Sequence, residues 1–137
     1  MGGRIVVHSL DQARAALAAA SALKRKVVLA SAPGAGGYAG PAWFKALAAL
    51  AHASYPESRM EAVLDCGADS GVALAALRMG FKRVGFSGGE AARAKLGEIA
   101  RALGAAVESG GEDALDLRDG KNAEARCEAY LAGGRLA

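Results

Sequence analysis

A histidine, an aspartate and a cysteine that could do chemistry occur at two separate places in the chain. His8 follows the short apolar run IVV, and the pair Asp65 and Cys66 follows the run AVL. An imidazole titrates near neutral pH and a nearby cation favours the thiolate form of cysteine, so these side chains suit acid–base or nucleophilic catalysis. In the structural alternative, Asp65 holds a tight turn, Cys66 is a small buried hydrophobic residue and His8 only ends a strand. We take His8, Asp65 and Cys66 as candidate catalytic residues and keep both interpretations open.

A glycine-rich stretch, SAPGAGGYAGP at residues 31–41, lies between an apolar run and a predicted helix. Backbone N–H groups in such a loop, next to the positive end of a helix, can bind an anion. The spacing Gly34-x-Gly36-x-x-Ala39 also matches the dinucleotide fingerprint, but Pro41 interrupts its helix start and Asp65 lies further on than the usual ribose-binding acid. No GK[ST] sequence follows, which excludes a P-loop NTPase. The stretch predicts a phosphate or carboxylate site, with a purely structural turn as the alternative.

The other polar residues that follow strands have two alternative roles, ligand binding or helix capping. Asp69 is well placed as the N-cap of the helix SGVALAALRM. In the sequence SGGE, Ser87 and Glu90 have the spacing of a capping box, and Glu90 would also repel an anion. The candidate ligand-binding residues share a position just after a strand or just before a helix; they are Ser31, Gly34, Gly36, Gly37, Asp69, Ser87, Gly88 and Gly89.

These residues must be positioned by strands and helices that alternate along the chain about every 25 residues. Strands are expected at 5–7, 27–30, 62–64, 83–86 and 105–108, each followed by a helix; residues 109–121 are expected to form a loop, and Asn122 to cap the last helix. Parallel strands need such helical crossovers, so the pattern predicts an α/β fold: a flavodoxin-like three-layer sandwich with a five-stranded parallel sheet. The expected strand order, 2-1-3-4-5, would bring His8 toward Asp65 and Cys66. A half-barrel-like open sheet is the alternative.

Length and composition narrow the class of protein. The 137 residues fit a single α/β domain, 1–137, and 53% hydrophobic with 23% charged residues is typical of a globular chain. No apolar run approaches the length of a membrane span, and the first residues lack the apolar stretch of a secretory signal, so we expect a cytoplasmic protein. Cys66 and Cys127 lie far apart without nearby histidines, which predicts neither a disulfide nor a zinc site. The net charge of +3 is scattered and aromatic residues are few, so no nucleic-acid partner is expected. Which cofactor the protein binds, if any, is unknown from the sequence.

The run AVLDCGADSGVALAALRMGFKRVGFSGGE, residues 62–90, resembles the middle of a response-regulator receiver domain. The resemblance implies that Asp65 is the phosphoryl acceptor and that Ser87 is the switch hydroxyl. His8 and Ser9 stand where that family has an acidic pair, and Glu108 lies in the region of its lysine. These replacements remove the Mg²⁺ ligands and the phosphoryl partner, so the resemblance implies a degenerate, signalling-type module.

More broadly, the stretches SAPGAGGYAGPAWF, VLDCGADSGVALAAL and FSG resemble a set of small uncharacterised bacterial α/β proteins. That resemblance implies the fold and no reaction. Two functions are therefore expected as alternatives. One is binding of a small anionic ligand at the carboxyl ends of the strands. The other is a non-catalytic interaction module that forms a homodimer or docks a partner through the helix carrying Trp43 and Phe44.

Overall fold

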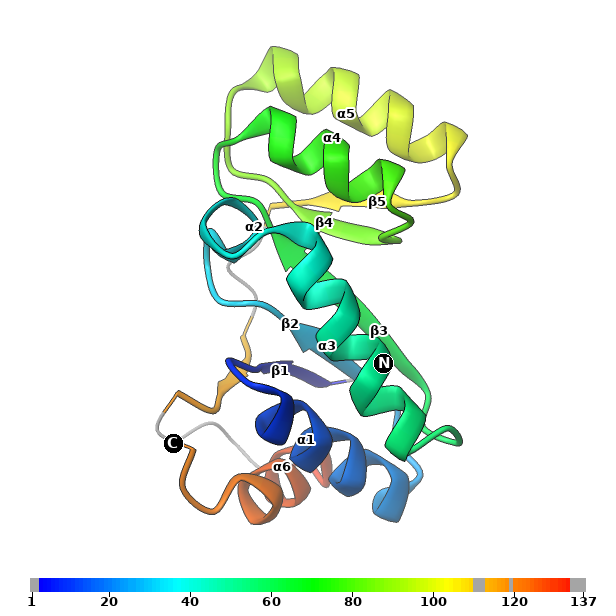
Figure 1. Ribbon diagram of the computed structural model, residues 1–137, viewed down its shortest axis with the longest axis vertical. Helices are drawn as coiled ribbons and strands as arrows, with labels where there is room; N and C mark the ends of the chain where they lie inside the picture. The colour runs from blue at the N-terminus through cyan, green and yellow to red at the C-terminus, as the bar shows by residue number, and fades with distance from the viewer. Residues whose placement is uncertain (1–2, 110–112, 119, 134–137) are drawn as a thin grey trace. The chain divides into compact units, whose positions relative to one another are not determined.

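The computed structural model describes residues 3–109, 113–118 and 120–133, which contain six strands and six helices (Figure 1). In chain order they are β1 (Gly3–Val6), α1 (Leu10–Leu23), β2 (Val27–Ala30), α2 (Ala35–Tyr38), α3 (Pro41–Ser54), β3 (Met60–Asp65), α4 (Ser70–Arg78), β4 (Arg83–Gly85), α5 (Glu90–Ala102), β5 (Ala106–Glu108), β6 (Leu115–Asp116) and α6 (Ala123–Leu131). They form two compact units. Unit one comprises Met1–Ala30, Ala46–Glu61 and Glu112–Ala137, and unit two comprises Ser31–Lys45 and Ala62–Gly111.

Unit one has β1 as the middle of three parallel strands. Ile5 is the register partner of both Leu29 in β2 and Leu115 in β6. The pairing with β2 continues past β1, because the N–H of Val7 donates to the carbonyl of Ala30 at 3.0 Å. Both edges of β1 are therefore occupied by other strands.

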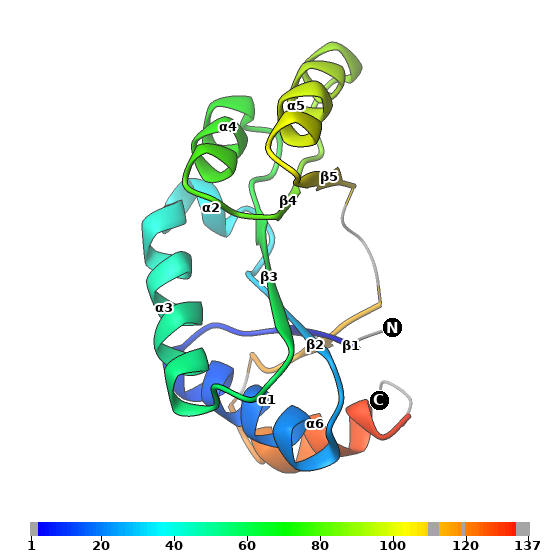
Figure 2. The same ribbon diagram turned by 90° about the vertical axis from the view of Figure 1, so that its right-hand side faces the viewer.

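The helices α1 and α6 pack side by side on one face of these strands (Figures 1 and 2). Gly3 permits the close approach of α6, since a Cβ at this position would lie 2.6 Å from the ring of Tyr130. The Tyr130 hydroxyl also accepts a hydrogen bond from the backbone N–H of Arg4 at 3.1 Å. The largest fully buried side chains of this unit are Ile5, Val7, Leu17, Val27, Leu29, Leu117 and Cys127.

Unit two has β4 between β3 and β5, again with parallel pairing that aligns Leu64, Val84 and Val107. The helices α4 and α5 lie side by side on one face of these strands (Figures 1 and 2). In the same unit, the rings of Phe44 and Phe81 stack with their centroids 6.4 Å apart. The carboxyl ends of β3 and β4 therefore lead directly into the first turns of α4 and α5.

The α/β fold with parallel strands is confirmed, and two finer predictions are wrong. There are six described strands and not five, because Leu115 and Asp116 form β6 inside the predicted loop. The order 2-1-3-4-5 fails because β2 and β6 occupy the two edges of β1, which leaves no place beside it for β3. Within each unit the neighbouring helices, α1 with α6 or α4 with α5, share one face, and the three-layer sandwich stays a prediction.

The helix starts test the capping predictions one by one. Ser9 caps α1 as expected, because its Oγ accepts the N–H of Gln12. Asp69 caps α4 in the same way through the N–H of Val72. The capping box of Ser87 and Glu90 is not formed, since the N-cap of α5 is Gly89 without a side-chain hydrogen bond. Asn122 stands at the N-cap of α6, but its side chain makes no capping bond. None of the helices in the described part of the chain has the length and apolar character needed to cross a bilayer.

Candidate functional site

The predicted site residues fall into different units. Asp65, Cys66 and all the predicted ligand-binding residues belong to unit two, whereas His8 belongs to unit one. The expected meeting of His8 with Asp65 and Cys66 depended on β3 lying beside β1, and β6 occupies that place.

Asp65 holds the glycine-rich segment to the end of β3. Its Oδ1 accepts the backbone N–H of Gly34 at 2.8 Å and that of Gly67 at 2.9 Å. A carboxylate that accepts two backbone N–H groups stabilises the local chain path. This is the turn-holding role of the structural interpretation; the phosphoryl-acceptor role implied by the receiver resemblance stays a prediction.

The glycine-rich segment is built as a one-turn helix, α2, packed against α4. The Oγ of Ser31 is buried; it accepts the N–H of Asp65 at 2.9 Å and donates to the carbonyl of Ala32 at 3.2 Å. The N–H of Gly37 donates to the carbonyl of Gly34 at 2.9 Å. The polar groups that a bound anion would use at Ser31, Gly34 and Gly37 are thus already engaged within the unit.

Cys66 is a buried thiol that lies against the same segment, since a Cβ on Gly36 would be 3.2 Å from its Sγ. Its Sγ donates a weak hydrogen bond to the carbonyl of Leu64 at 3.7 Å. Burial, reinforced by the negative charges of Asp65 and Asp69, raises the pKa of the Cys66 thiol to about 12. Since the thiolate is the nucleophilic form, this environment opposes nucleophilic catalysis by Cys66.

The residues that follow β4 differ in how closely other atoms surround them. Gly88 is required by packing, because a Cβ there would lie 2.4 Å from the ring of Phe86. The Ser87 side chain is exposed, and its N–H donates to the carbonyl of Gly67 at 2.8 Å. Gly89 begins α5 without a capping side chain. The first N–H groups of α5 therefore lack a side-chain acceptor.

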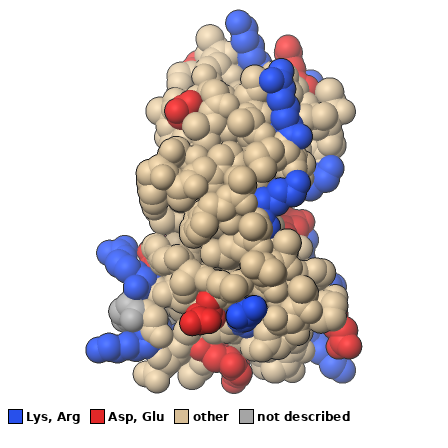
Figure 3. Space-filling view, in the orientation of Figure 1, with Lys and Arg blue, Asp and Glu red and all other residues tan. Residues whose placement is uncertain are grey.

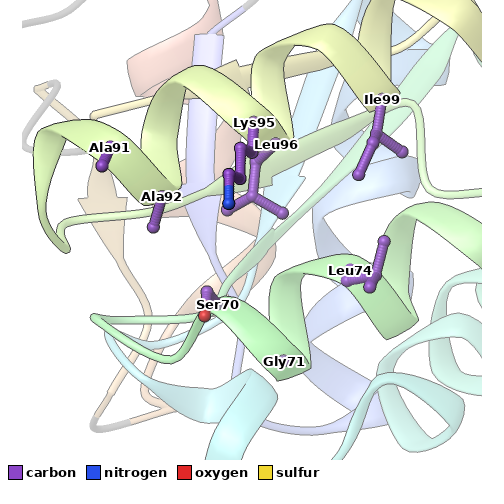
Figure 4. A pocket seen from close by; sticks show the side chains of 8 residues that line it. All are labelled: Ser70, Gly71, Leu74, Ala91, Ala92, Lys95, Leu96 and Ile99. Atoms are coloured by element: carbon purple, nitrogen blue, oxygen red, sulfur yellow. The ribbon is translucent and has the colours of Figure 1, made fainter.

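A pocket of about 400 Å³ lies between α4 and α5 in unit two (Figure 4). It is lined by residues of both helices: Ser70, Gly71, Leu74, Ala91, Ala92, Lys95, Leu96 and Ile99. One end of the pocket is formed by the first turns of both helices, directly after β3 and β4. Figure 4 shows Lys95 projecting toward the space between the helices. The side chain of Lys95 forms no ion pair or hydrogen bond with any of the described residues.

Lys95 and Ser70 are polar pocket residues that sequence reasoning missed. Ser70 directly follows the capping residue Asp69, so the end of β3 indicated its neighbourhood. Lys95 lies in the second turn of α5, where no motif distinguishes it from other surface lysines. Its relevance depends on α5 packing beside α4.

In unit one, His8 meets a carboxylate that the sequence analysis placed in a loop. The Nε2 of His8 lies 2.7 Å from Oδ1 of Asp116 in β6. Both side chains are about one-third exposed. The alternating sequence ALDL at residues 114–117 was the available signal for β6, and it is too short to be decisive.

No protein-family profile matches the chain, and no curated protein matches it. Among the described residues, no group of three or more histidine, cysteine, aspartate or glutamate side chains is placed to hold a metal ion. The function is therefore inferred from the geometry of the two units.

Proposed function

We propose that this protein binds a small ligand carrying a phosphate or carboxylate group at the carboxyl ends of β3 and β4, in the pocket between α4 and α5. The observation that carries the proposal is the convergence on one pocket of two helix N-termini and the ammonium group of Lys95, which pairs with none of the described residues. The pocket volume of about 400 Å³ is within the range of small-molecule sites.

The electrostatics at this end of the pocket favour an anion. The aligned peptide dipoles and unsatisfied N–H groups at a helix N-terminus attract negative charge. The ammonium of Lys95 adds a formal positive charge, and the hydroxyl of Ser70 adds a hydrogen-bond donor. A phosphate or carboxylate at Ser70 and Lys95 would thus be bound by charge-assisted hydrogen bonds.

The remaining walls of the pocket suit an apolar ligand body. Leu74, Leu96 and Ile99 line it beyond the helix ends. Burial of apolar ligand surface there adds binding free energy that does not depend on salt. A ligand with an anionic head and a carbon skeleton therefore fits better than inorganic phosphate alone.

Two carboxylates near the same helix ends oppose an anion. The carboxylate of Asp69 accepts the N–H of Val72 and is thereby engaged in capping α4. Glu90 is exposed in the first turn of α5. We expect Glu90 to weaken anion binding through charge repulsion.

The proposal is tested by a thermal-shift and calorimetric screen of phosphates, sugar phosphates and carboxylic acids. A ligand that binds only the native state raises the melting temperature. The substitution Lys95→Ala should weaken binding about tenfold, the loss expected for one charge-assisted hydrogen bond. Glu90→Gln should strengthen binding, and added salt should weaken it.

The matched control is Arg101→Ala, which removes the same charge from the last turn of α5. It should leave the affinity nearly unchanged. Absence of any anion-dependent shift, or equal losses in the Lys95 and Arg101 variants, would reject the proposal.

A second candidate function is homodimerisation through the start of α3, in the manner of a non-catalytic or receiver-like interaction module. Tyr38 and Trp43 are 73% and 39% exposed. The surface over α2 carries no acidic or basic side chain (Figure 3). An uncharged apolar surface can pair with a second copy without like-charge repulsion. Sedimentation of the wild type and Trp43→Glu over a concentration series tests this, and a wild type that stays monomeric would exclude it.

A further inference from the structure

His8 and Asp116 form a second site, in unit one, that lies at the carboxyl ends of β1 and β6. Val6 and Asp116 are register partners in these parallel strands. His8 lies two residues beyond Val6, so alternation along the strand directs it to the same face as Asp116. The distance of 2.7 Å between Nε2 of His8 and Oδ1 of Asp116 is that of a charge-assisted hydrogen bond.

Backbone and side-chain contacts fix both members of the pair. The N–H of His8 donates to Oε1 of Gln12 at 2.8 Å. Oδ1 of Asp116 also accepts the N–H of Arg118 at 2.9 Å, and Oδ2 lies 3.3 Å from the Arg118 guanidinium. The carbonyl of Asp116 accepts a hydrogen bond from Arg126 at 3.1 Å. A pair held at this many points is pre-organised and does not have to be assembled by a ligand.

The pairing determines which ring nitrogen of His8 is available. Asp116 accepts a proton from Nε2, which favours the tautomer with Nδ1 unprotonated. None of the described residues forms a hydrogen bond with Nδ1. When Nδ1 takes a proton, the imidazolium charge is compensated by the carboxylate of Asp116. This is the division of roles found in histidine bases oriented by a carboxylate.

We propose that His8 is an acid–base residue and that Asp116 is its positioning residue, acting on ester substrates that carry an anionic group. Nδ1 accepts a proton from water as the water oxygen bonds to the acyl carbon; the imidazolium then returns the proton to the leaving oxygen as the carbon–oxygen bond breaks. The guanidinium of Arg118, 81% exposed beside the pair, favours an anionic substrate over a cationic one.

His52 provides a matched control within the same chain. Its Nε2 lies 3.2 Å from the backbone carbonyl of Ser58, a neutral acceptor. His52 is partly buried as His8 is, but it has no carboxylate partner in the described structure. A difference between the two imidazoles therefore reports the effect of Asp116.

The test uses hydrolysis of p-nitrophenyl acetate and of an anionic nitrophenyl ester by the full chain at neutral pH. His8→Gln should lower the protein-dependent rate by about a hundredfold, the lower range of general acid–base contributions. Asp116→Asn should lower it about tenfold or more, with partial recovery in Asp116→Glu. His52→Gln should leave the rate unchanged, and the anionic ester should be the better substrate.

Nitrogen-15 NMR gives a second readout, and its first part, the tautomer of His8 in the wild type, does not depend on any variant folding. His8 should show the tautomer protonated at Nε2, and Asp116→Asn should shift it toward a mixture, while His52 stays the same in both proteins. Equal esterolysis by wild type and His8→Gln, or a wild-type His8 protonated at Nδ1, would overturn the proposal and leave the pair as a structural clamp on β6.

Discussion

At the scale of single residues, the neighbours Gly36 and Gly37 differ in the space that each leaves for a side chain. A Cβ on Gly36 would lie 3.0 Å from the carbonyl oxygen of Asp65 and 3.2 Å from Sγ of Cys66, whereas a Cβ on Gly37 would meet no atom within 4 Å. Gly36→Ala should therefore cost about 1–3 kcal/mol through overpacking. Gly37→Ala should be neutral or slightly stabilising, because alanine favours a helix. Urea denaturation of both variants measures the difference, and equal effects would show that the segment is loosely packed.

Asp116 should make stability depend on pH at the acid end. Burial acts to raise its pKa, but the hydrogen bonds and positive charges of His8 and Arg118 outweigh burial and lower the pKa from its ordinary 3.8. A folded-state pKa below the unfolded one stabilises the fold fully above the unfolded value, and this contribution is lost as the pH falls through the folded value. Asp116→Asn, which cannot titrate, should be destabilising at pH 5 and progressively less so toward pH 2. Denaturation midpoints across this range test it; a pH-independent difference would contradict the prediction.

At the scale of elements, the starts of α4 and α5 differ in how they are capped. Asp69→Ala removes the acceptor of the Val72 N–H and should cost about 1 kcal/mol. Ser87→Ala should cost less than about 0.5 kcal/mol, because α5 is capped by Gly89 without a side chain. The free energies of unfolding of the two variants decide this. A larger loss of unfolding free energy for Ser87→Ala would instead support the capping box of Ser87 and Glu90 that the sequence predicted.

The strand β6 shows how a short element is specified by its partners. It has only two residues, too few for local propensity to form a strand. It is held by its pairing with β1, by the contact of Asp116 with His8 and by full burial of Leu117. None of these contacts is local in sequence, so residues 109–121 resemble a loop when the sequence is taken alone.

At the scale of the whole molecule, the reactivity of each cysteine measures whether the unit that contains it is folded. Both are free thiols, Cys66 in unit two and Cys127 in unit one, and burial raises the pKa of each to about 12. In the native protein at pH 8, both should react with Ellman's reagent at least about a hundredfold more slowly than in the unfolded chain.

The same thiols test whether the chain unfolds as the single domain that its length predicts. Unit one is assembled from three separate segments and unit two from two, so neither unit forms from one contiguous stretch of chain. We therefore expect one cooperative transition. In each single variant one thiol remains, Cys66 in Cys127→Ala and Cys127 in Cys66→Ala. Both thiols should become reactive at the same urea concentration. Two separate midpoints would show that the units unfold independently.

Several features were determined by the sequence itself. Some elements depend only on neighbouring residues and are marked by the apolar runs at 27–30 and 62–64 and by the proline at the start of α3. The structure contains β2, β3 and α3 at these places. The N-caps Ser9 and Asp69 were predictable for the same reason, since a cap bonds to an N–H three residues away. Helix and strand periodicity also established the α/β class and the parallel pairing.

Strand order, the partner of His8 and the pocket of Lys95 were decided only by the tertiary structure. His8 and Asp116 are separated by more than a hundred residues, and their meeting depends on which edge of β1 receives the last strand. Lys95 becomes part of a pocket only because α5 packs beside α4. Local sequence encodes hydrogen bonds and side-chain periodicity over a few residues, whereas these sites arise from free-energy differences between ways of pairing complete elements.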